Sequence, residues 1–520
     1  MDIITYFYDY FHNMRCRTNG PSEPHPFAGE AKEDTKITLH QGSTCIHGNN
    51  CYARPEMTPL NPHIFRAYDI RGTAGEQLTE ETYRLIGRGF GSVLRELSKK
   101  EHPTVVLGRD ARTHSPDFEK AMMEGLCSTG CTVLHIGQTP SPLNYFTICT
   151  KGLDGGVQIT ASHNPAEDNG IKLQIRDAHA YAGEDIQNLR RRIEKEQFVD
   201  GEGSGEEWDA ISPYFAFLEE LFGSFAQNMP VAIDTGNGVA GPVYAQALRH
   251  AGCEVHELYT EPDGTFPNHA ADPSKRETLK DLQHTVTEKK CALGVAFDGD
   301  GDRLGLVDEQ GTIRTADEVL LLLAQDHLSR HKGKPVVCTV SSSGALQTEI
   351  RRWGGVPVMC KVGHSFVEHA MQEHGALLGG EQSGHFFCGE EYFGFDDALV
   401  AALRVLKIVH AAGKPVSKLC ADFPTVYQTP EQRPFCPDEE KTRVIGEITE
   451  HFAKKYPVKT MDGARIDFGD GAWAGIRQSN TSPCISICLE ARSPGKLAEI
   501  ERVVTEEIQK HPEVNIRGRT

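Results

Sequence analysis

The sequence lacks the long apolar segments of a membrane protein. No run of apolar residues approaches the ~18 that a membrane-spanning helix needs. The first residues, MDIITYFYDYF, carry acidic side chains and have no apolar core of the kind found in a secretory signal. We therefore expect no membrane partner.

The sequence also lacks paired cysteines. Its 15 cysteines are scattered along the chain, and no two of them are separated by two residues in a CxxC pattern. Disulfide-rich secreted domains and common zinc modules have closely spaced pairs, so neither class fits. This usage indicates reduced thiols in a cytoplasmic protein.

The sequence has fewer basic than acidic residues. The chain has 54 Lys and Arg residues against 73 Asp and Glu residues, which gives a formal charge of −19. A surface of this sign is repelled by nucleic acid and by anionic membranes, so we expect neither as a partner. An anionic substrate would need a local basic site.

The length of 520 residues exceeds what one hydrophobic core supports and predicts three or four domains. Residues 1–58 have no hydrophobic periodicity and are rich in Gly, Pro, Asn, Thr and His. We expect them to form a disordered extension, with the functional chain starting near Met57.

From near residue 60, strand and helix patterns alternate in three successive rounds. These rounds predict three similar α/β domains with mixed sheets. Strands and helices are grouped rather than alternating in the last part, which predicts a smaller α+β domain. The acidic, Gly-rich stretch Asp200 to Glu206 is interpreted as the first linker. The predicted domains are residues 59–207, 208–312, 313–425 and 426–520.

One loop of the first domain has the character of a catalytic loop. Gly156 to Thr160 is a run of strand formers that ends abruptly in Ala161-Ser162-His163-Asn164-Pro165. Open α/β sheets bind ligands at the carboxyl ends of their strands. Ser162 has small neighbours, so we expect an accessible hydroxyl that could relay a transferred group. An ordinary surface turn is the alternative, since Ser, Asn and Pro are common turn residues.

The second domain contains three carboxylates at alternate positions. Asp298, Asp300 and Asp302 follow an apolar strand and are separated by glycines, an arrangement that suits a hard divalent cation. An EF-hand is the rival interpretation, because Glu309 occupies position 12 of a loop starting at Asp298. Position 6, however, is Arg303 where the EF-hand needs Gly, and the flanks read as strands. We therefore favour a Mg²⁺ site.

Later strand ends carry further polar loops. Glu381 to Ser383 offers a carboxylate, an amide and a hydroxyl that suit sugar hydroxyl groups. Arg477 to Thr481 offers the donors that a phosphate needs. Lys361 and His364 add a cation and an imidazole at the end of another strand. Taken singly, Glu381 to Ser383 is a weak signal, Arg477 to Thr481 is more often a polar turn, and a structural role is the default interpretation of His364.

Together these loops carry a resemblance. From about Met57 onward the chain closely resembles the α-D-phosphohexomutases, most closely the bacterial phosphomannomutase/phosphoglucomutase group. The motifs are IFRAYDIRG (Ile64 to Gly72), TASHNP (Thr160 to Pro165), DGDGDR (Asp298 to Arg303), GEQSGH (Gly380 to His385), YFGFDD (Tyr392 to Asp397) and RQSNTSP (Arg477 to Pro483). The resemblance implies a heart-shaped, four-domain fold in which one loop per domain meets in a central cleft.

The resemblance also implies residue roles. Ser162 would be the phosphoserine, Lys172, Arg71 and His385 the candidates for proton transfer, and Arg303 a stabiliser of the transferring group. Asp298, Asp300 and Asp302 would bind Mg²⁺ together with Ser162. The implied substrate-binding residues are Tyr68, His163, Lys361, His364, Glu381, Ser383, Arg477, Ser479, Asn480 and Thr481.

These roles imply a phosphohexomutase that interconverts the 1-phosphate and 6-phosphate of mannose, glucose or both. The reaction would pass through a phosphoserine enzyme and a 1,6-bisphosphate, with glucose 1,6-bisphosphate as activator. We expect small sugar phosphates as partners and a monomer or weak dimer.

Three alternatives stay open at the level of sequence. A phosphoglucosamine mutase shares the serine and metal motifs, but it typically has Gly-Thr-Glu-Pro where this chain has Asn480-Thr481-Ser482-Pro483. A metal-dependent phosphatase would use water as the acceptor. A calcium-binding protein or non-catalytic sugar-phosphate sensor would bind without turnover.

Overall fold

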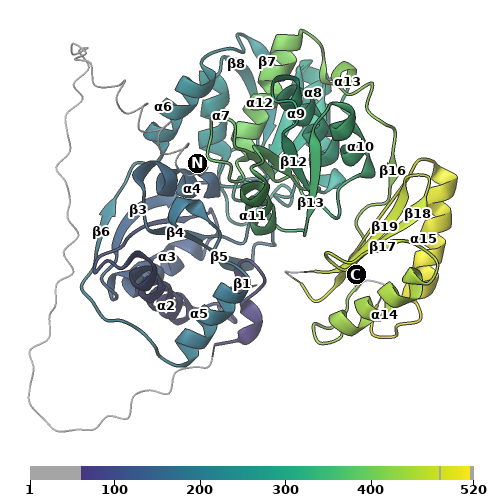
Figure 1. Ribbon diagram of the computed structural model, residues 1–520. Helices are drawn as coiled ribbons and strands as arrows, with labels where there is room; N and C mark the ends of the chain where they lie inside the picture. The colour runs from purple at the N-terminus through teal and green to yellow at the C-terminus, as the bar shows by residue number, and fades with distance from the viewer. Residues whose placement is uncertain (1–59, 480–481, 516–520) are drawn as a thin grey trace, which may run out of the picture. The chain divides into compact units, whose positions relative to one another are not determined.

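The computed structural model describes residues 60–479 and 482–515, and in this part four β-sheets follow one another along the chain (Figure 1). The extension predicted over residues 1–58 lies outside the described residues. Within the described ranges, no helix is both long and apolar enough to cross a bilayer. Every cysteine there is a free thiol, as the sequence predicts.

The first sheet has six strands in the order β1-β5-β4-β2-β3-β6. Its strands are β1 (Ile70–Thr73), β2 (Thr104–Arg109), β3 (Thr132–Gln138), β4 (Gly155–Ile159), β5 (Asp168–Ile175) and β6 (Ser204–Glu207). Its helices are α2 (Glu80–Ser98), α3 (Ser115–Cys127), α4 (Ser141–Lys151) and α5 (Glu184–Glu194). β5 runs antiparallel to β4, so the loop that joins them returns at the carboxyl end of β4.

The two faces of this sheet bury different helices. Val105 and Leu107 of β2 belong to a core with α2, α3 and α5, whereas Val106 between them belongs to a core with α4. Successive side chains of a strand point to opposite faces, so a strand covered on both sides is apolar throughout.

The second and third sheets repeat the mixed α/β pattern, with strand orders β11-β10-β9-β7-β8 and β13-β12-β14-β15. The strands of the second sheet are β7 (Met229–Asp234), β8 (Cys253–Leu258), β9 (Leu293–Phe297), β10 (Leu304–Asp308) and β11 (Ile313–Arg314), with helices α6 (Ile211–Phe222), α7 (Gly241–His250) and α8 (Lys280–Lys289). The strands of the third are β12 (Pro335–Thr339), β13 (Val356–Cys360), β14 (Leu378–Gly380) and β15 (Phe386–Cys388), with helices α9 (Ala316–Arg330), α10 (Gly344–Arg352), α11 (His364–His374), α12 (Ala398–Ala412) and α13 (Val416–Leu419).

The fourth sheet is antiparallel, in the order β16-β20-β19-β18-β17, and appears in yellow and yellow-green in Figure 1. Its elements are β16 (Tyr427–Gln428), α14 (Lys441–Ala453), β17 (Val458–Lys459), β18 (Ala464–Gly469), β19 (Ala472–Gln478), β20 (Ile485–Ala491) and α15 (Pro494–Ile508). Three α/β units followed by an α+β unit are the fold class that the sequence predicts, and that prediction is confirmed. The residue numbers given above for the domain boundaries stay predictions.

The cores are distributed unevenly among these units. One continuous apolar cluster joins elements of the first three sheets, including Phe146 of α4, Tyr244 of α7 and Leu403 of α12. The fourth sheet has a separate core with its own two helices. The first three units are therefore held to one another by apolar packing.

One sequence interpretation is wrong. The stretch predicted as a linker, Asp200 to Glu206, contains most of β6, which pairs in parallel with β3 through Thr132 and Ser204. Acidic and glycine residues disfavour strands, but the free edge of β3 supplies backbone hydrogen bonds that composition does not reveal.

Asp397 provides a test of how this fold is held together. Its carboxylate caps α12 by accepting the Val400 N–H at 3.0 Å, and it accepts the hydroxyls of Tyr214 at 2.9 Å and Tyr392 at 2.7 Å. Replacing Asp397 by Ala removes the cap and leaves two buried hydroxyls unpaired, so we expect a loss of about 3–5 kcal/mol in the free energy of unfolding.

Urea denaturation followed by circular dichroism measures this loss. Thr79→Ala is the matched control, because Thr79 caps α2 by accepting the Thr82 N–H and contacts one hydroxyl of its own helix, that of Thr82, rather than two hydroxyls from other segments; it should cost about 1 kcal/mol. Equal losses in the two variants would contradict the argument.

Candidate active site

Ser162 lies in the loop between β4 and β5, in a backbone conformation that serine seldom adopts. Its φ angle is 51°, in the left-handed region, and its N–H donates to Thr160 Oγ1 at 2.8 Å. Such a conformation costs on the order of 1 kcal/mol or more and persists only where the surroundings hold it.

Arg112 holds this loop. Its side chain is fully buried and is paired with Asp110 at 3.0 Å. The guanidinium donates to the carbonyl oxygens of Ser162 at 3.0 Å, Asn164 at 2.6 Å and Asp168 at 2.8 Å, and also to that of Pro165. One planar donor group therefore fixes the path of the whole loop.

Arg71 supports the same loop from β1. Its Nε donates to Asp69 at 2.6 Å, and its terminal nitrogen donates to the carbonyl of Ala161 at 3.1 Å and to Asn164 Oδ1 at 2.8 Å. Arg71, predicted as a proton-transfer residue, is thus placed against the serine loop as a structural donor as well.

The Ser162 hydroxyl is buried, which corrects the expectation of an accessible side chain. The residue is 1% exposed, and its Oγ donates to Asp298 Oδ2 at 2.6 Å and lies 3.1 Å from Nδ1 of His163. The acidic loop from the second unit covers it, a contact between distant segments that local sequence does not show. Burial, followed by the charges of Arg303 and Arg71, holds the pKa of His163 well below its ordinary value.

Asp298, Asp300 and Asp302 lie between β9 and β10, and all three are fully buried. Asp298 Oδ1 accepts the N–H groups of Gly301, Asp302 and Arg303, each at 3.1 Å, which curls the loop around that oxygen. The carboxylates are close enough for one oxygen of each to lie within 4.8 Å of the others.

Two oxygens of this cluster accept no hydrogen bond from the protein. Asp300 Oδ1 and Asp302 Oδ1 are buried and accept no hydrogen bond, while their Oδ2 atoms face the Lys172 ammonium, which is 2.7 Å from Asp300 Oδ2. Burial raises the pKa of Asp298 well above its ordinary value, and its two acidic neighbours add to this. Unpartnered carboxylate oxygens around one point fit a hard divalent cation such as Mg²⁺.

The EF-hand alternative does not fit the structure. β9 and β10 flank the acidic loop as an antiparallel pair rather than as two helices. Glu309 turns to α13 instead, where it accepts the hydroxyl and, at 3.2 Å, the N–H of Ser417.

His385 connects the acidic loop to the third unit. Its Nε2 accepts from Arg303 Nε at 3.0 Å, and its Nδ1 lies 2.9 Å from Asp396 Oδ2. These contacts place the ring hydrogen on Nδ1, directed at Asp396. Burial is the main reason that the pKa of His385 is lowered to about 4, so the ring is neutral.

Tyr68, His364 and Glu381 form the next part of the site. The rings of Tyr68 and His364 meet edge to face at 5.1 Å, and Glu381 accepts the N–H of Gly363 at 2.8 Å. Nε2 of His364 is buried without a protein partner. Lys361 is exposed at the end of β13, and Ser383 is half-buried two residues beyond Glu381.

The predicted phosphate-binding loop, Arg477 to Thr481, contacts residues of the third and fourth units. Arg477 Nε donates to Ser341 Oγ at 3.4 Å, and Ser479 Oγ accepts from Arg433 at 2.9 Å. Lys441 donates to the carbonyl of Ser479 at 3.0 Å. Asn480 and Thr481 lie outside the described residues.

The loop of Ser162 is therefore joined to the acidic loop through Asp298. The acidic loop is in turn joined to the segment from Glu381 to His385 through Arg303 and Asp302. Sequence reasoning missed Arg112, Asp396 and Arg433. Asp396 belongs to the YFGFDD motif. Two adjacent acidic residues inside an apolar segment could have marked Asp396 as a functional residue. Arg112 and Arg433 each have an acidic neighbour two residues away, Asp110 and Glu431, but their contacts with the backbone carbonyls of the serine loop and with the Ser479 hydroxyl are not visible in the sequence.

The chain was compared with known proteins. Models of the phosphoglucomutase/phosphomannomutase α/β/α domains I, II and III match residues 62–200, 212–311 and 315–427, and the model of the C-terminal domain matches residues 436–507. A phosphomannomutase/phosphoglucomutase of Pseudomonas aeruginosa is 40% identical over 452 residues, which are 86% of this chain and 96% of that protein. The chain belongs to the phosphoglucomutase/phosphomannomutase family.

Other members agree with this assignment. A phosphoglucomutase of Neisseria gonorrhoeae is 38% identical over 88% of this chain and 99% of its own length. The crystal structure of a phosphoglucomutase/phosphomannomutase family protein from Burkholderia thailandensis matches with a TM-score of 0.81 and 34% identity, over 88% of this chain and all of that one. The predicted resemblance is confirmed, and the chain is an enzyme of the phosphohexomutase class, whose members generally depend on a metal ion.

The contacts between Arg112 and the carbonyls of the serine loop lead to a testable prediction. Arg112→Lys keeps the charge but cannot reach four carbonyls from one planar group, so we expect amide hydrogen exchange at residues 161–164 to become roughly 10-fold faster or more. Exchange followed by mass spectrometry measures this. Arg109→Lys is the control, because Arg109 ends β2 three residues before Arg112 and its side chain contacts Glu119, Gln138 and the Asp110 carbonyl rather than the serine loop. Unchanged exchange in Arg112→Lys would refute the role of the Arg112 contacts.

Proposed function

We propose that this enzyme interconverts hexose 1-phosphates and 6-phosphates, of mannose and of glucose, with Ser162 as the phosphoryl carrier. The observation that carries the proposal is the 2.6 Å hydrogen bond between Ser162 Oγ and Asp298. It places a nucleophilic hydroxyl against a cluster of carboxylates with unpartnered oxygens, where a bound cation and a transferring phosphoryl group would meet.

Asp298, Asp300 and Asp302, with an oxygen on Ser162, would hold Mg²⁺. The bound ion would neutralise negative charge that develops on the transferring group. The all-oxygen ligand set supports a hard cation over a transition metal.

The first transfer breaks the bond between phosphorus and Ser162 Oγ and forms a bond from phosphorus to a sugar hydroxyl, which gives the 1,6-bisphosphate. Arg303 lies 3.9 Å from Asp298, so its guanidinium is close enough to the carrier to stabilise charge on the phosphoryl oxygens. Ser162 leaves as an alkoxide beside Asp298, on which this cationic group also lies.

The hydroxyl of the sugar loses its proton in this step, and we assign His385 as the acceptor. Asp396 holds the ring hydrogen on Nδ1, so Nε2 carries the lone pair, which takes the sugar proton when the Arg303 N–H that it accepts turns to the phosphoryl oxygens. Lys172 sits between Asp300 and Asp302, where it balances their charge. We therefore assign proton transfer to His385 and charge balance to Lys172.

The second transfer returns the other phosphoryl group to Ser162 after the bisphosphate has turned end for end. Arg477 and Ser479 would bind whichever phosphate is not reacting, and Arg433 would add a second guanidinium through its contact with Ser479. Glu381 and Ser383 would hold sugar hydroxyls O3 and O4. Those contacts do not distinguish the C2 epimers glucose and mannose.

A rate comparison tests this function. Glucose 1-phosphate, mannose 1-phosphate and glucosamine 1-phosphate are each supplied with Mg²⁺ and a trace of glucose 1,6-bisphosphate as activator. We expect similar kcat/KM for the first two and a much lower value for the amino sugar. Ser162→Ala should lower kcat by at least about 10³-fold, since loss of a nucleophile has effects of that scale or larger.

The other outcomes identify the alternatives. A preference for the amino sugar would indicate a phosphoglucosamine mutase. Release of free phosphate would indicate a phosphatase. Sugar-phosphate binding without turnover, and without phosphoserine at Ser162 by mass spectrometry, would indicate a sensor.

The pKa of His364 leads to a prediction of how activity depends on pH. Burial alone would lower its pKa, but Glu368 at 3.8 Å and the charge of Asp396 outweigh burial and raise the pKa to about 9, against a smaller opposing effect of Lys172. The ring also faces Tyr68 and His385. Below pH 9 the imidazolium is charged, and its unpartnered Nε2 would donate to a substrate phosphate.

We therefore expect kcat/KM to be level from pH 7 to about pH 8.5 and to fall as the pH rises through about 9. His364→Gln should lower kcat/KM at pH 7.5 by about 10- to 100-fold, the value of one charge-assisted hydrogen bond, and should remove this alkaline fall. His374→Gln, an exposed residue at the end of the same helix, is the control. An unchanged alkaline fall in His364→Gln would show that another group titrates.

A further inference from the structure

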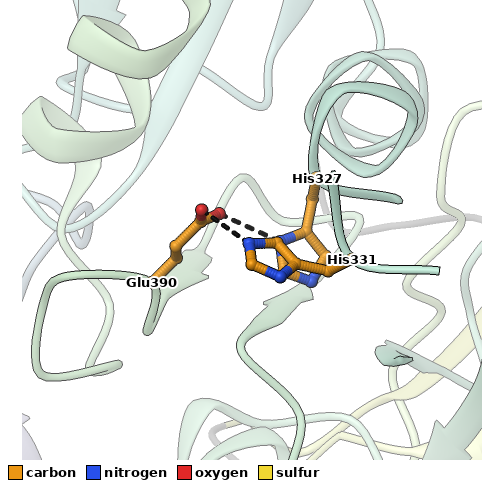
Figure 2. Close-up of side chains that lie close together, drawn as sticks. All are labelled: His327, His331 and Glu390. Carbon is orange, nitrogen blue, oxygen red and sulfur yellow. Dashed lines mark hydrogen bonds and ion pairs between the residues drawn. The ribbon is translucent and has the colours of Figure 1, made fainter. Parts of the chain in front are cut away.

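A second cluster of possible metal ligands lies outside the active site. His327 and His331 are four residues apart at the carboxyl end of α9, and Glu390 follows β15 in the loop that leads toward α12 (Figure 2). Nδ1 of His327 is 3.1 Å from Glu390 Oε2, and Nε2 of His331 is 2.8 Å from Glu390 Oε1. Figure 2 shows both imidazole rings turned to the one carboxylate.

The spacing of these atoms is that of a coordination shell. One ligand atom from each residue lies within 4.8 Å of the other two. Ligands about 2.0–2.2 Å from a zinc ion lie about 3.3–3.6 Å apart in a tetrahedral site. The two contacts to Glu390, at 3.1 and 2.8 Å, would have to lengthen by about 0.2–0.8 Å to admit an ion. His331 follows the last residue of α9 and is still tied to the helix, since its N–H donates to the His327 carbonyl at 2.9 Å, so both rings lie at the same helix end.

Burial makes the cluster more than a surface ion pair. The side chains of His327 and Glu390 are 5% and 14% exposed, and that of His331 is 34% exposed. Nε2 of His327 is buried without a partner, so this ring is oriented by its Nδ1 contact with Glu390. The more exposed side at His331 gives an ion and a water molecule a way in.

We propose that His327, His331 and Glu390 form a second metal site, which takes a zinc-class transition-metal ion rather than Mg²⁺. Imidazole nitrogens suit zinc, cobalt and nickel, whereas Mg²⁺ prefers oxygen ligands only. The ion replaces two N–H···O hydrogen bonds, and each ring hydrogen moves to its other nitrogen. A water molecule completes four-coordination.

The neighbouring charges are compatible with a bound cation. Arg330 also contacts Glu390, but its guanidinium pairs with Asp326 at 2.6 Å and is 45% exposed, so it can turn to Asp326 when an ion binds. Arg404 contacts the Glu390 carbonyl and not its carboxylate. When the metal ion binds Nδ1 of His327, the ring hydrogen lies on Nε2, which is buried without a hydrogen-bond partner. We therefore expect this site to bind the ion more weakly than a closed zinc site.

The site would have a structural effect on the catalytic side of the third unit. Glu390 precedes Asp396 in the same loop, and Phe387 and Asp396 form a backbone bridge. A metal ion would tie the end of α9 to the segment that brings Asp396 to His385. We therefore expect thermal stability to depend on the ion more than activity does.

The experiment uses the full-length enzyme, freed of metal with EDTA and returned to excess Mg²⁺ to fill the acidic loop. Co²⁺ is then titrated, and the visible absorption of tetrahedral Co²⁺ is recorded before and after Zn²⁺ is added. We expect one Co²⁺ per chain, displaced by Zn²⁺, and a higher Tm with Zn²⁺. His331→Ala and Glu390→Gln should each weaken binding by more than about 100-fold, beyond the usual loss from an outer contact.

His284→Ala is the matched control. His284 and Glu288 form an exposed i, i+4 pair at 3.4 Å without a third ligand, so this variant should bind Co²⁺ like the unaltered chain. Mg²⁺-dependent mutase activity should persist in His331→Ala. Absence of the tetrahedral spectrum, or a spectrum and Tm response retained in both His331→Ala and Glu390→Gln, would overturn the proposal.

Discussion

The active site depends on the balance of charge around three buried carboxylates. Asp298, Asp300 and Asp302 are fully buried, and such groups are costly unless each charge is compensated. Lys172 reaches two of them from β5, and Asp298 is compensated by backbone N–H groups, the Ser162 hydroxyl and the nearby Arg303. The serine loop and the acidic loop thus stabilise each other, because neither set of polar groups is satisfied alone.

Antiparallel strand pairs bring these loops together. β5 returns along β4, and β10 returns along β9, so each loop stands at a strand end with both of its arms anchored in a sheet. The apolar core shared by the first three units then fixes the sheets relative to one another. Catalytic groups need positions accurate to about 0.5 Å, and rigid elements provide this better than isolated loops.

The fold class and most of the site could be predicted from the sequence, because strand periodicity and polar residues at strand ends are local features. Ser162, the aspartates and Glu381 of the proposed site were predicted in this way. The burial of Ser162 was not, since the covering acidic loop lies more than a hundred residues away. Arg112 escaped notice because four of its partners are main-chain carbonyls, which leave no trace in side-chain composition. β6 was missed for a similar reason, as its pairing with β3 uses the backbone only.

The fourth unit differs from the others in how it is attached. Its core is separate, and the contacts that join it to the earlier units are mainly polar: Arg465 donates to the carbonyls of Val340 and Ser342, Asp462 accepts from Val362, and Arg66 pairs with Asp438. The Arg66–Asp438 pair is partly exposed and can exchange with water at little net cost, whereas the Arg465 hydrogen bonds are buried. In the proposed reaction the bisphosphate turns end for end, which needs space near Arg477 and Ser479, the residues proposed to bind its non-reacting phosphate. These two residues lie on the unit with the separate core, whereas the serine and acidic loops lie on units that share one apolar core, so the proposed phosphate site can shift without moving those two loops against each other.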